Sequence, residues 1–398
     1  MRLSSRASAM SPSPTMAIDA KSKQMMAEGL DVVNFSVGEP DFATPGHIAR
    51  AGIRAIEQGH TKYTAAAGNL DLRKAICEKL RKDNGLEYKP EQIVVSNGAK
   101  QSIFNAYMIL LDPGDEVIIQ APYWVSYPEM VKLAGGVPVT VATDEATGFK
   151  MTPDMIKEKL TPRTRAINLN SPSNPTGAVY TKAELEAIAN LAVEHDLMII
   201  TDEMYEKLLY GGAQHISIAS FGPEVKARTI TVNGMSKAYA MTGWRMGYTA
   251  SETIYAKAMG DLQSQTTSGA SSISQKAALE ALVGTQEPVE VMRQEFDRRR
   301  IHMMARLNRL PGVAVQVAPE GAFYLFPNVA GTFGMTLRGR KIATSDDLAE
   351  VILEESKVGL VPGTGFGAAD YLRFSYATSM ERIDEGLNRI EGLLREGK

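Results

Sequence analysis

The sequence around Lys237 favours covalent chemistry at its side-chain amine. It follows the apolar stretch of residues 229–232 and lies within NGMSKAYAMTGWRMG, residues 233–247, where glycines and alanines surround it. Small neighbours leave room for a bulky group at the tip of the side chain. A lysine amine shielded from water loses its proton readily and can attack a carbonyl carbon. A lone lysine after a strand is usually a surface residue. The local pattern therefore makes Lys237 a candidate nucleophile but does not establish that role.

Two further charges occupy places where a charge needs a partner. Asp202 directly follows the apolar run of residues 197–201, and Arg373 interrupts the alternating run of residues 371–375. A buried carboxylate or guanidinium is costly unless an ion of opposite charge binds it. From the local pattern alone, each also fits an ordinary strand residue at the protein surface.

A site for an anion is predicted where SNGAK, residues 96–100, leaves a strand and begins a helix. Free backbone N–H groups and the helix dipole favour negative charge there. The glycine-rich segment GTGFG, residues 363–367, also follows a strand-like run, but no helix with dinucleotide-binding spacing comes after it.

Cysteine and histidine offer little chemistry in this chain. Cys77 is the single cysteine, which excludes a disulfide framework and a cysteine metal site. The five histidines are scattered, and none lies four residues from another, as a helical metal site would require. We therefore expect no metal site.

The candidate residues must be positioned by alternating strands and helices. Continuous apolar runs separated by helical patterns such as 99–111 and 182–195 predict an α/β fold with a largely parallel sheet. These runs are residues 93–96, 116–119, 166–169, 197–201 and 229–232. Long helical patterns at 253–282 and 289–310, followed by short strands between 313 and 377, predict a smaller α+β domain. We expect an arm over residues 1–45, a large domain over 46–290 and a small domain over 291–398.

Composition limits the partners and the location. The chain has 398 residues with 43 Lys and Arg against 46 Asp and Glu, so its net charge of −3 gives no reason to expect nucleic acid or an anionic membrane surface. No run of 18 apolar residues predicts a transmembrane helix, and the first ten residues lack the apolar core of a signal peptide. A cytoplasmic protein is expected.

Residues 234–247 resemble the pyridoxal-phosphate attachment signature of class I aminotransferases. Further motifs between Gly38 and Arg373 extend this resemblance over nearly the whole chain, and PYWVSY at residues 122–127 is similar to the bacterial aspartate aminotransferase branch. The resemblance implies a fold-type I pyridoxal-phosphate transferase with a mostly parallel seven-stranded sheet in its large domain. It also implies that pyridoxal 5'-phosphate forms a Schiff base with Lys237.

The same resemblance implies which residues contact the cofactor. Asp202 would keep the pyridine nitrogen protonated, Trp124 would stack on the ring, and Tyr205 and Asn174 would donate to its phenolic oxygen. The phosphate would be bound by Gly98, Ala99, Lys100, Ser236, Arg245 and, from the partner subunit of a homodimer, Tyr63. Some relatives carry a phosphate-binding hydroxyl three residues before the lysine, where this chain has Gly234, so Ser236 is expected to replace it.

The resemblance also implies how the substrate is bound. Arg373 and the backbone at Gly38 would bind the α-carboxylate, and Trp124 and Asn174 would also contact the substrate. Lys100 and Ser13 would bind a distal carboxylate. This favours an aminotransferase for aspartate or glutamate with 2-oxoglutarate or oxaloacetate.

Other readings stay open at this point. An aromatic, alanine or prephenate aminotransferase would share the cofactor site, although Ser11 stands where relatives that accept prephenate carry a lysine. The fold also occurs as a ligand-binding domain joined to a DNA-binding module, but the arm before Asp41 is too short for such a module.

Overall fold

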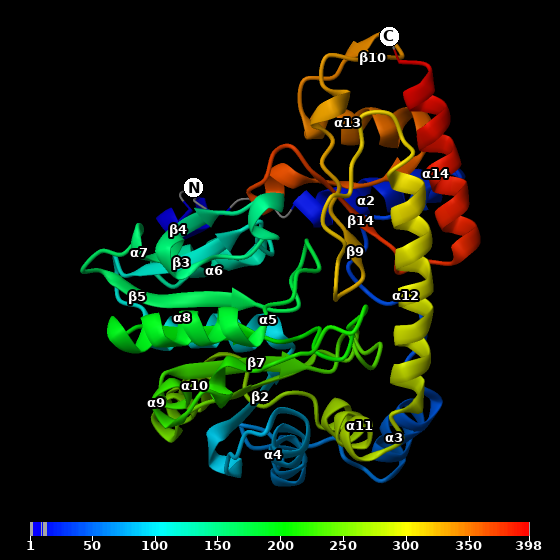
Figure 1. Ribbon diagram of the computed structural model, residues 1–398. Coiled ribbons are helices and arrows are strands. Elements are labelled where there is room, and N and C mark those ends of the chain that lie inside the picture. Colours follow the sequence, from blue (N-terminus) through cyan, green and yellow to red (C-terminus); the bar gives the residue numbers. More distant parts are fainter. Residues whose placement is uncertain (1–2, 9, 11–13, 398) are drawn as a thin grey trace.

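A seven-stranded sheet forms the centre of the computed structural model, which describes residues 3–8, 10 and 14–397 (Figure 1). Its strand order is β2-β8-β7-β6-β5-β3-β4, and β8 runs antiparallel to both of its neighbours while all other pairs are parallel. The strands are β2 (Ile93–Asn97), β3 (Glu116–Ala121), β4 (Val137–Ala142), β5 (Thr164–Asn170), β6 (Met198–Asp202), β7 (Thr229–Gly234) and β8 (Met246–Ala250). The predicted α/β class with a mostly parallel seven-stranded sheet is confirmed.

Helices cover both faces of this sheet because successive strand residues point to opposite sides. On one face, Ile119 and Ile200 share a core with Ile103 of α5 (Ala99–Leu110). On the other face, Ile118 and Ile199 pack with α8 (Lys182–Glu194). Towards the β2 and β8 edge, α4 (Leu70–Asn84) and α11 (Ser272–Val283) close a third cluster.

The expected helical pattern over 253–282 is divided in the structure. It forms α10 (Thr253–Thr266) and α11, and Ser268 between them has a φ of 59°. A non-glycine residue in the left-handed region cannot continue a right-handed helix, so the chain turns there.

The C-terminal part is built around a small antiparallel sheet of order β13-β14-β9. Its strands are β9 (Tyr324–Leu325), β13 (Val361–Pro362) and β14 (Leu372–Ser375), and α13 (Ser345–Val351) and α14 (Met380–Arg395) lie beside them. The 21-residue helix α12 (Glu287–Leu307) runs from the region of the large sheet to this part (Figure 1). The expected domain boundary near residue 290 falls in the first turn of α12 and stays a prediction.

The N-terminal segment joins the C-terminal part rather than the large sheet. Its strand β1 (Val33–Asn34) pairs in parallel with β12 (Val358–Gly359). The remaining elements are α1 (Ser5–Ser8), α2 (Pro14–Ala27), α3 (Gly46–Glu57), α6 (Ser126–Leu133), α7 (Pro153–Lys157), α9 (Pro223–Ala227), β10 (Thr336–Leu337) and β11 (Arg340–Lys341). Across the residues the structure describes, no helix combines the length and apolar character needed to cross a membrane.

Candidate active site

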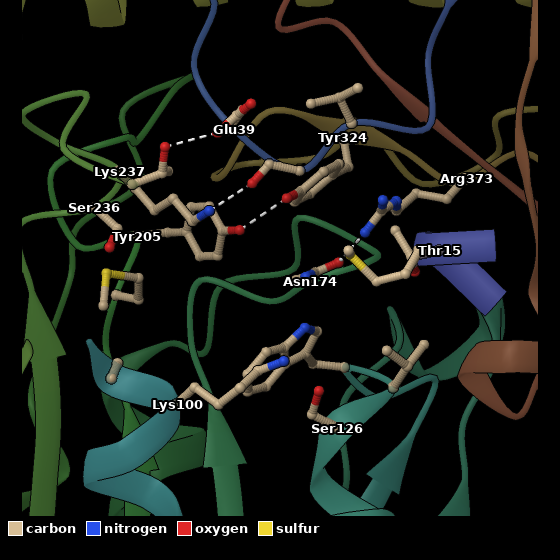
Figure 2. A pocket seen from close by; sticks show the side chains of 18 of the residues that line it. Thr15, Glu39, Lys100, Ser126, Asn174, Tyr205, Ser236, Lys237, Tyr324 and Arg373 are labelled. Carbon is tan, nitrogen blue, oxygen red and sulfur yellow. Dashed lines mark hydrogen bonds between the residues drawn. The ribbon is translucent and has the colours of Figure 1, made fainter. Parts of the chain in front are cut away.

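A cavity of about 450 Å³ lies at the carboxyl ends of the parallel strands, where ligands of open α/β sheets bind (Figure 2). Trp124, Asn174, Asp202 and Lys237 reach it from the segments that follow β3, β5, β6 and β7, or from a strand end itself. The predicted site residues that line it are Gly38, Ala99, Lys100, Trp124, Asn174, Asp202, Tyr205, Ser236, Lys237, Arg245 and Arg373.

Asp202 is a buried carboxylate at the end of β6. Its Oδ2 accepts a hydrogen bond from Tyr127 Oη at 2.7 Å, and its Oδ1 accepts one from the backbone N–H of Met204 at 3.2 Å. Burial raises the pKa of Asp202 to about 6. Among residues 3–8, 10 and 14–397, none forms an ion pair with it. A cationic group of a ligand would supply the missing charge.

Lys237 presents its amine in the same cavity. Nζ donates to the carbonyl oxygen of Gly38 at 2.5 Å and lies 5.9 Å from the centre of the Tyr205 ring and 5.8 Å from that of Phe323. Burial, together with the positive charges of Arg373 and Arg245, lowers the pKa of Lys237 to about 8. Near neutral pH, a far larger fraction of this amine is therefore neutral and nucleophilic than of an ordinary lysine amine.

Asn170 links the segments that carry these groups. Its Nδ2 donates to the backbone carbonyl of Asp202 at 3.0 Å, and its Oδ1 accepts from the backbone N–H of Asn174 at 2.9 Å. The last residue of β5 thereby ties the turn holding Asn174 to the end of β6.

Arg373 is a buried guanidinium on β14. Nη1 donates to Asn174 Oδ1 at 3.0 Å and Nη2 donates to the carbonyl oxygen of Ser36 at 2.7 Å, while Nε is buried without a hydrogen-bond partner. Burial lowers its pKa. Within the described part of the chain, its partners are neutral oxygens, so a ligand carboxylate would supply the opposite charge.

Basic groups and helix amides gather at the other end of the cavity. Gly98 is the N-cap of α5 with a φ of 84°, and a Cβ placed on it would lie 2.5 Å from Nη2 of Arg245. Lys100 Nζ lies 5.0 Å from the centre of the Trp124 ring, and its pKa is lowered by partial burial and by Arg245. This end is suited to an anion such as a phosphate group.

Two predicted residues that the structure describes, Gly98 and Tyr63, are not part of the cavity lining. Gly98 stands behind it, in contact range of Arg245. Tyr63 is 98% exposed and lies away from the cavity within one chain. Ser13, like Ser11, falls outside the described residues.

Sequence reasoning missed other residues that line the cavity, among them Thr15, Ser126, Tyr127 and Tyr324. Ser126 and Tyr127 belong to the PYWVSY segment, in which only Trp124 was predicted to be a site residue. Tyr324 lies in the apolar run of residues 323–326, where nothing separates it from an ordinary core tyrosine. In the structure its hydroxyl is 2.9 Å from that of Tyr205 (Figure 2).

Known proteins resemble this chain over nearly its whole length. A family model described as aminotransferase class I and II matches residues 30–390. An aspartate aminotransferase from Geobacillus stearothermophilus is 49% identical over 98% of both chains, and a probable aspartate/prephenate aminotransferase from Aquifex aeolicus is 49% identical over 99% of both. The solved aspartate aminotransferase from Thermus thermophilus with maleate superposes with a TM-score of 0.93, at 45% identity over 99% of this chain and 100% of that one. The expected fold-type I architecture is thus confirmed, and the chain belongs to the class I and II aminotransferases.

Proposed function

We propose that this enzyme transfers the amino group of aspartate or glutamate to 2-oxoglutarate or oxaloacetate, using pyridoxal 5'-phosphate bound at Lys237. The observation that carries the proposal is the arrangement of three groups around one cavity. A low-pKa amine, Lys237, lies in the same cavity as a carboxylate and a guanidinium, Asp202 and Arg373, that have no ionic partners among the residues described.

The residues present fit this cofactor. The buried Asp202 carboxylate suits a pyridinium nitrogen, and the N-terminus of α5 with Arg245 and Ser236 suits a phosphate. Tyr205 and Asn174 place donors between these two ends, and Trp124 offers an aromatic face. When bound, pyridoxal phosphate supplies an electron sink for the electron pair left at the substrate α-carbon.

Lys237 is assigned two tasks in the reaction. Its nitrogen would hold the cofactor covalently before substrate arrives. Once the substrate amine has taken its place, the freed Lys237 amine would accept a proton from the substrate α-carbon and deliver it to the cofactor carbon that is bonded to the substrate nitrogen. The lowered pKa of Lys237, about 8, suits a group that must both accept and release a proton near neutral pH.

Arg373 is assigned to the substrate α-carboxylate, which would supply the opposite charge that this guanidinium lacks. Lys100, at the opposite side of the cavity, is assigned to the distal carboxylate, together with Ser13. Two curated relatives named above carry aspartate in their names, and the Thermus structure holds maleate, itself a dicarboxylate. These observations support dicarboxylic substrates over aromatic amino acids or alanine.

Prephenate is a second candidate substrate, because the Aquifex relative is named a probable aspartate/prephenate aminotransferase. By its resemblance to the family, the chain has Ser11 where some close relatives that accept prephenate carry a lysine, so we expect weaker turnover of prephenate than of 2-oxoglutarate.

A homodimer with shared active sites is part of the proposal. Tyr63 is almost fully exposed in a single chain, as expected for a side chain that reaches a partner's phosphate site. The division into an arm (1–45), a large domain (46–290) and a small domain (291–398) is proposed with it.

The proposal is tested with purified wild-type protein, Lys237→Ala and, as control, the exposed Lys182→Ala. Wild type and Lys182→Ala should show the cofactor's visible absorbance, which sodium borohydride removes by fixing the cofactor to Lys237. Both should use aspartate and glutamate ahead of phenylalanine or alanine. Full turnover by Lys237→Ala, or a preference for phenylalanine or alanine, would overturn the proposal.

A further inference from the structure

Tyr324 joins two parts of the site that come from different sheets. It lies on β9 of the small antiparallel sheet, and its hydroxyl meets that of Tyr205, which follows β6 of the large sheet, at 2.9 Å. Both side chains are buried. Figure 2 shows Tyr324 between Tyr205 and Arg373, with its hydroxyl directed at Tyr205.

The ring of Tyr324 also supports Arg373. The guanidinium carbon lies 4.4 Å from the ring centre, within the range of a cation–π contact. Because this guanidinium is buried and has no carboxylate partner in the described part of the chain, the aromatic face is one of its few sources of negative potential. The same side chain thus touches the groups assigned to the cofactor and to the substrate carboxylate.

The direction of the hydroxyl–hydroxyl bond matters because each tyrosine has one proton to donate. If Tyr205 donated to Tyr324, it would have no proton left for a cofactor oxygen. Burial raises the pKa of both phenols, and the nearby Arg373 counteracts part of this for each of them, so both hydroxyls keep their protons. Because the Tyr205 proton is assigned to the cofactor oxygen, the 2.9 Å contact requires Tyr324 to be the donor of the pair.

We propose that Tyr324 is a positioning residue: its hydroxyl donates to Tyr205 Oη and so turns the Tyr205 proton towards the cofactor's phenolic oxygen, while its ring holds Arg373 in place for the substrate carboxylate. This inference rests on the proposed pyridoxal-phosphate function. It gives one side chain of the small sheet control over two separate properties, the proton affinity of the bound cofactor and the affinity for a dicarboxylate.

Two substitutions separate these properties. Tyr324→Phe removes only the hydroxyl and keeps the ring, and Tyr324→Leu removes both. Tyr376→Phe is the matched control, because Tyr376 is also a buried tyrosine near the small sheet, donates to the carbonyl oxygen of Ala322 and does not line the cavity. Tyr205→Phe and the double variant Tyr205→Phe/Tyr324→Phe complete a thermodynamic cycle.

The readouts are the pKa of the absorbance transition of the cofactor-loaded protein and the Kd of maleate. Tyr324→Phe should raise the transition pKa by roughly half a unit to one unit, with the Kd of maleate within about twofold of wild type. Tyr324→Leu should also weaken maleate about tenfold. Tyr205→Phe and the double variant should have the same transition pKa, since Tyr324 acts through Tyr205.

The role of Tyr324 is overturned if Tyr324→Phe behaves like Tyr376→Phe, or if the double variant shifts the transition clearly beyond Tyr205→Phe. Both results require wild-type protein that binds the cofactor and transaminates. Wild-type protein that does neither would instead refute the proposed function, and this inference with it.

Discussion

Asp202 shows how a single residue prepares the site for its ligand. The carboxylate is held by Tyr127 and by a backbone N–H, yet it forms no ion pair with any of the described residues. Its pKa of about 6 means that the charge needed to bind a pyridinium is present above that pH and lost below it.

Cofactor affinity is therefore expected to depend on pH through Asp202. The Kd of the cofactor-free protein for pyridoxal phosphate should rise as pH falls from 7 to 5, approaching about tenfold per pH unit below the pKa. Asp202→Asn should flatten this profile and lower kcat by about 1,000-fold. Titration of the cofactor into both proteins at several pH values measures the effect. An equally steep profile in Asp202→Asn would assign the titration to another group.

A second prediction at this scale concerns Arg373. The forked geometry of its guanidinium, and not only its charge, should determine how tightly it binds the substrate carboxylate. A lysine keeps the charge but cannot make two parallel hydrogen bonds to a carboxylate. Arg373→Lys should raise the KM for aspartate by about 10- to 100-fold and change kcat less. Steady-state kinetics beside the exposed control Arg395→Lys will show this. An unchanged KM would remove Arg373 from the substrate site.

At the scale of elements, the turn after β6 divides its side chains between two environments. Asp202 and Tyr205 enter the cavity, whereas Glu203 and Glu206 enter a buried cluster on another side. There Glu203 Oε2 lies 3.0 Å from Nε2 of His215, and Glu206 pairs with Lys79 of α4. The cluster ties the turn that carries two site residues to α4 and to the loop before residue 218.

His215 should make stability depend on pH. The two glutamates outweigh burial and Lys79, so the pKa of His215 is raised above 6.5 in the folded protein. Its contribution is fully present below the unfolded pKa and is lost as pH rises through the higher folded pKa. His215→Gln should cost about 1–3 kcal/mol at pH 6 and less at pH 9.

Urea unfolding at both pH values measures this difference, with the exposed His60→Gln as control. A deficit for His215→Gln that does not shrink with rising pH would show that the residue contributes packing and not charge.

The start of α5 provides a prediction about the phosphate end. Gly98 has a positive φ, and a methyl group there would collide with Arg245. Gly98→Ala should weaken pyridoxal phosphate about tenfold by displacing this guanidinium. Gly85→Ala is the matched control, since Gly85 also has a positive φ but no atom within 4 Å of an added Cβ. Similar cofactor affinities in both variants, measured by fluorescence titration, would contradict the prediction.

At the scale of the whole molecule, residues from distant parts of the chain come together around one cavity. The N-terminal segment supplies Ser36 and Gly38, the large sheet supplies Asp202 and Lys237, and the small sheet supplies Arg373. Ser36 and Gly38 contact Arg373 and Lys237 through their carbonyl oxygens. A change in how these parts pack would therefore move the carboxylate anchor relative to the amine.

If sites are shared across a homodimer, two defective variants should complement each other. Tyr63→Ala lacks the residue proposed to reach the partner, and Lys237→Ala lacks the amine. A mixed dimer has one site with both intact, so subunit exchange should restore up to about a quarter of wild-type activity. Activity of the mixture, measured with its sedimentation, tests this. Activity no higher than the mean of the separate variants would place Tyr63 outside the site.

The strands that carry the chemistry were predictable because their signals are local. Residues 93–96, 116–119, 166–169, 197–201 and 229–232 were all expected as strands, and they overlap β2, β3, β5, β6 and β7. Strands β4 and β8 were not anticipated. β4 is an edge strand with exposed residues, and β8 contains a glycine and a threonine, so neither shows a continuous apolar run.

The sequence by itself determined the class of fold, the family resemblance and the roles expected for Lys237, Asp202 and Arg373. Strand periodicity, turn residues and motif spacing act over a few neighbouring residues, so they can be recognised without a structure. Only the tertiary structure decided which groups touch. Lys237 and Gly38 are 199 residues apart, as are Arg373 and Asn174, and Tyr205 and Tyr324 are 119 apart. Such contacts depend on how two sheets and an N-terminal segment pack, which no local pattern encodes.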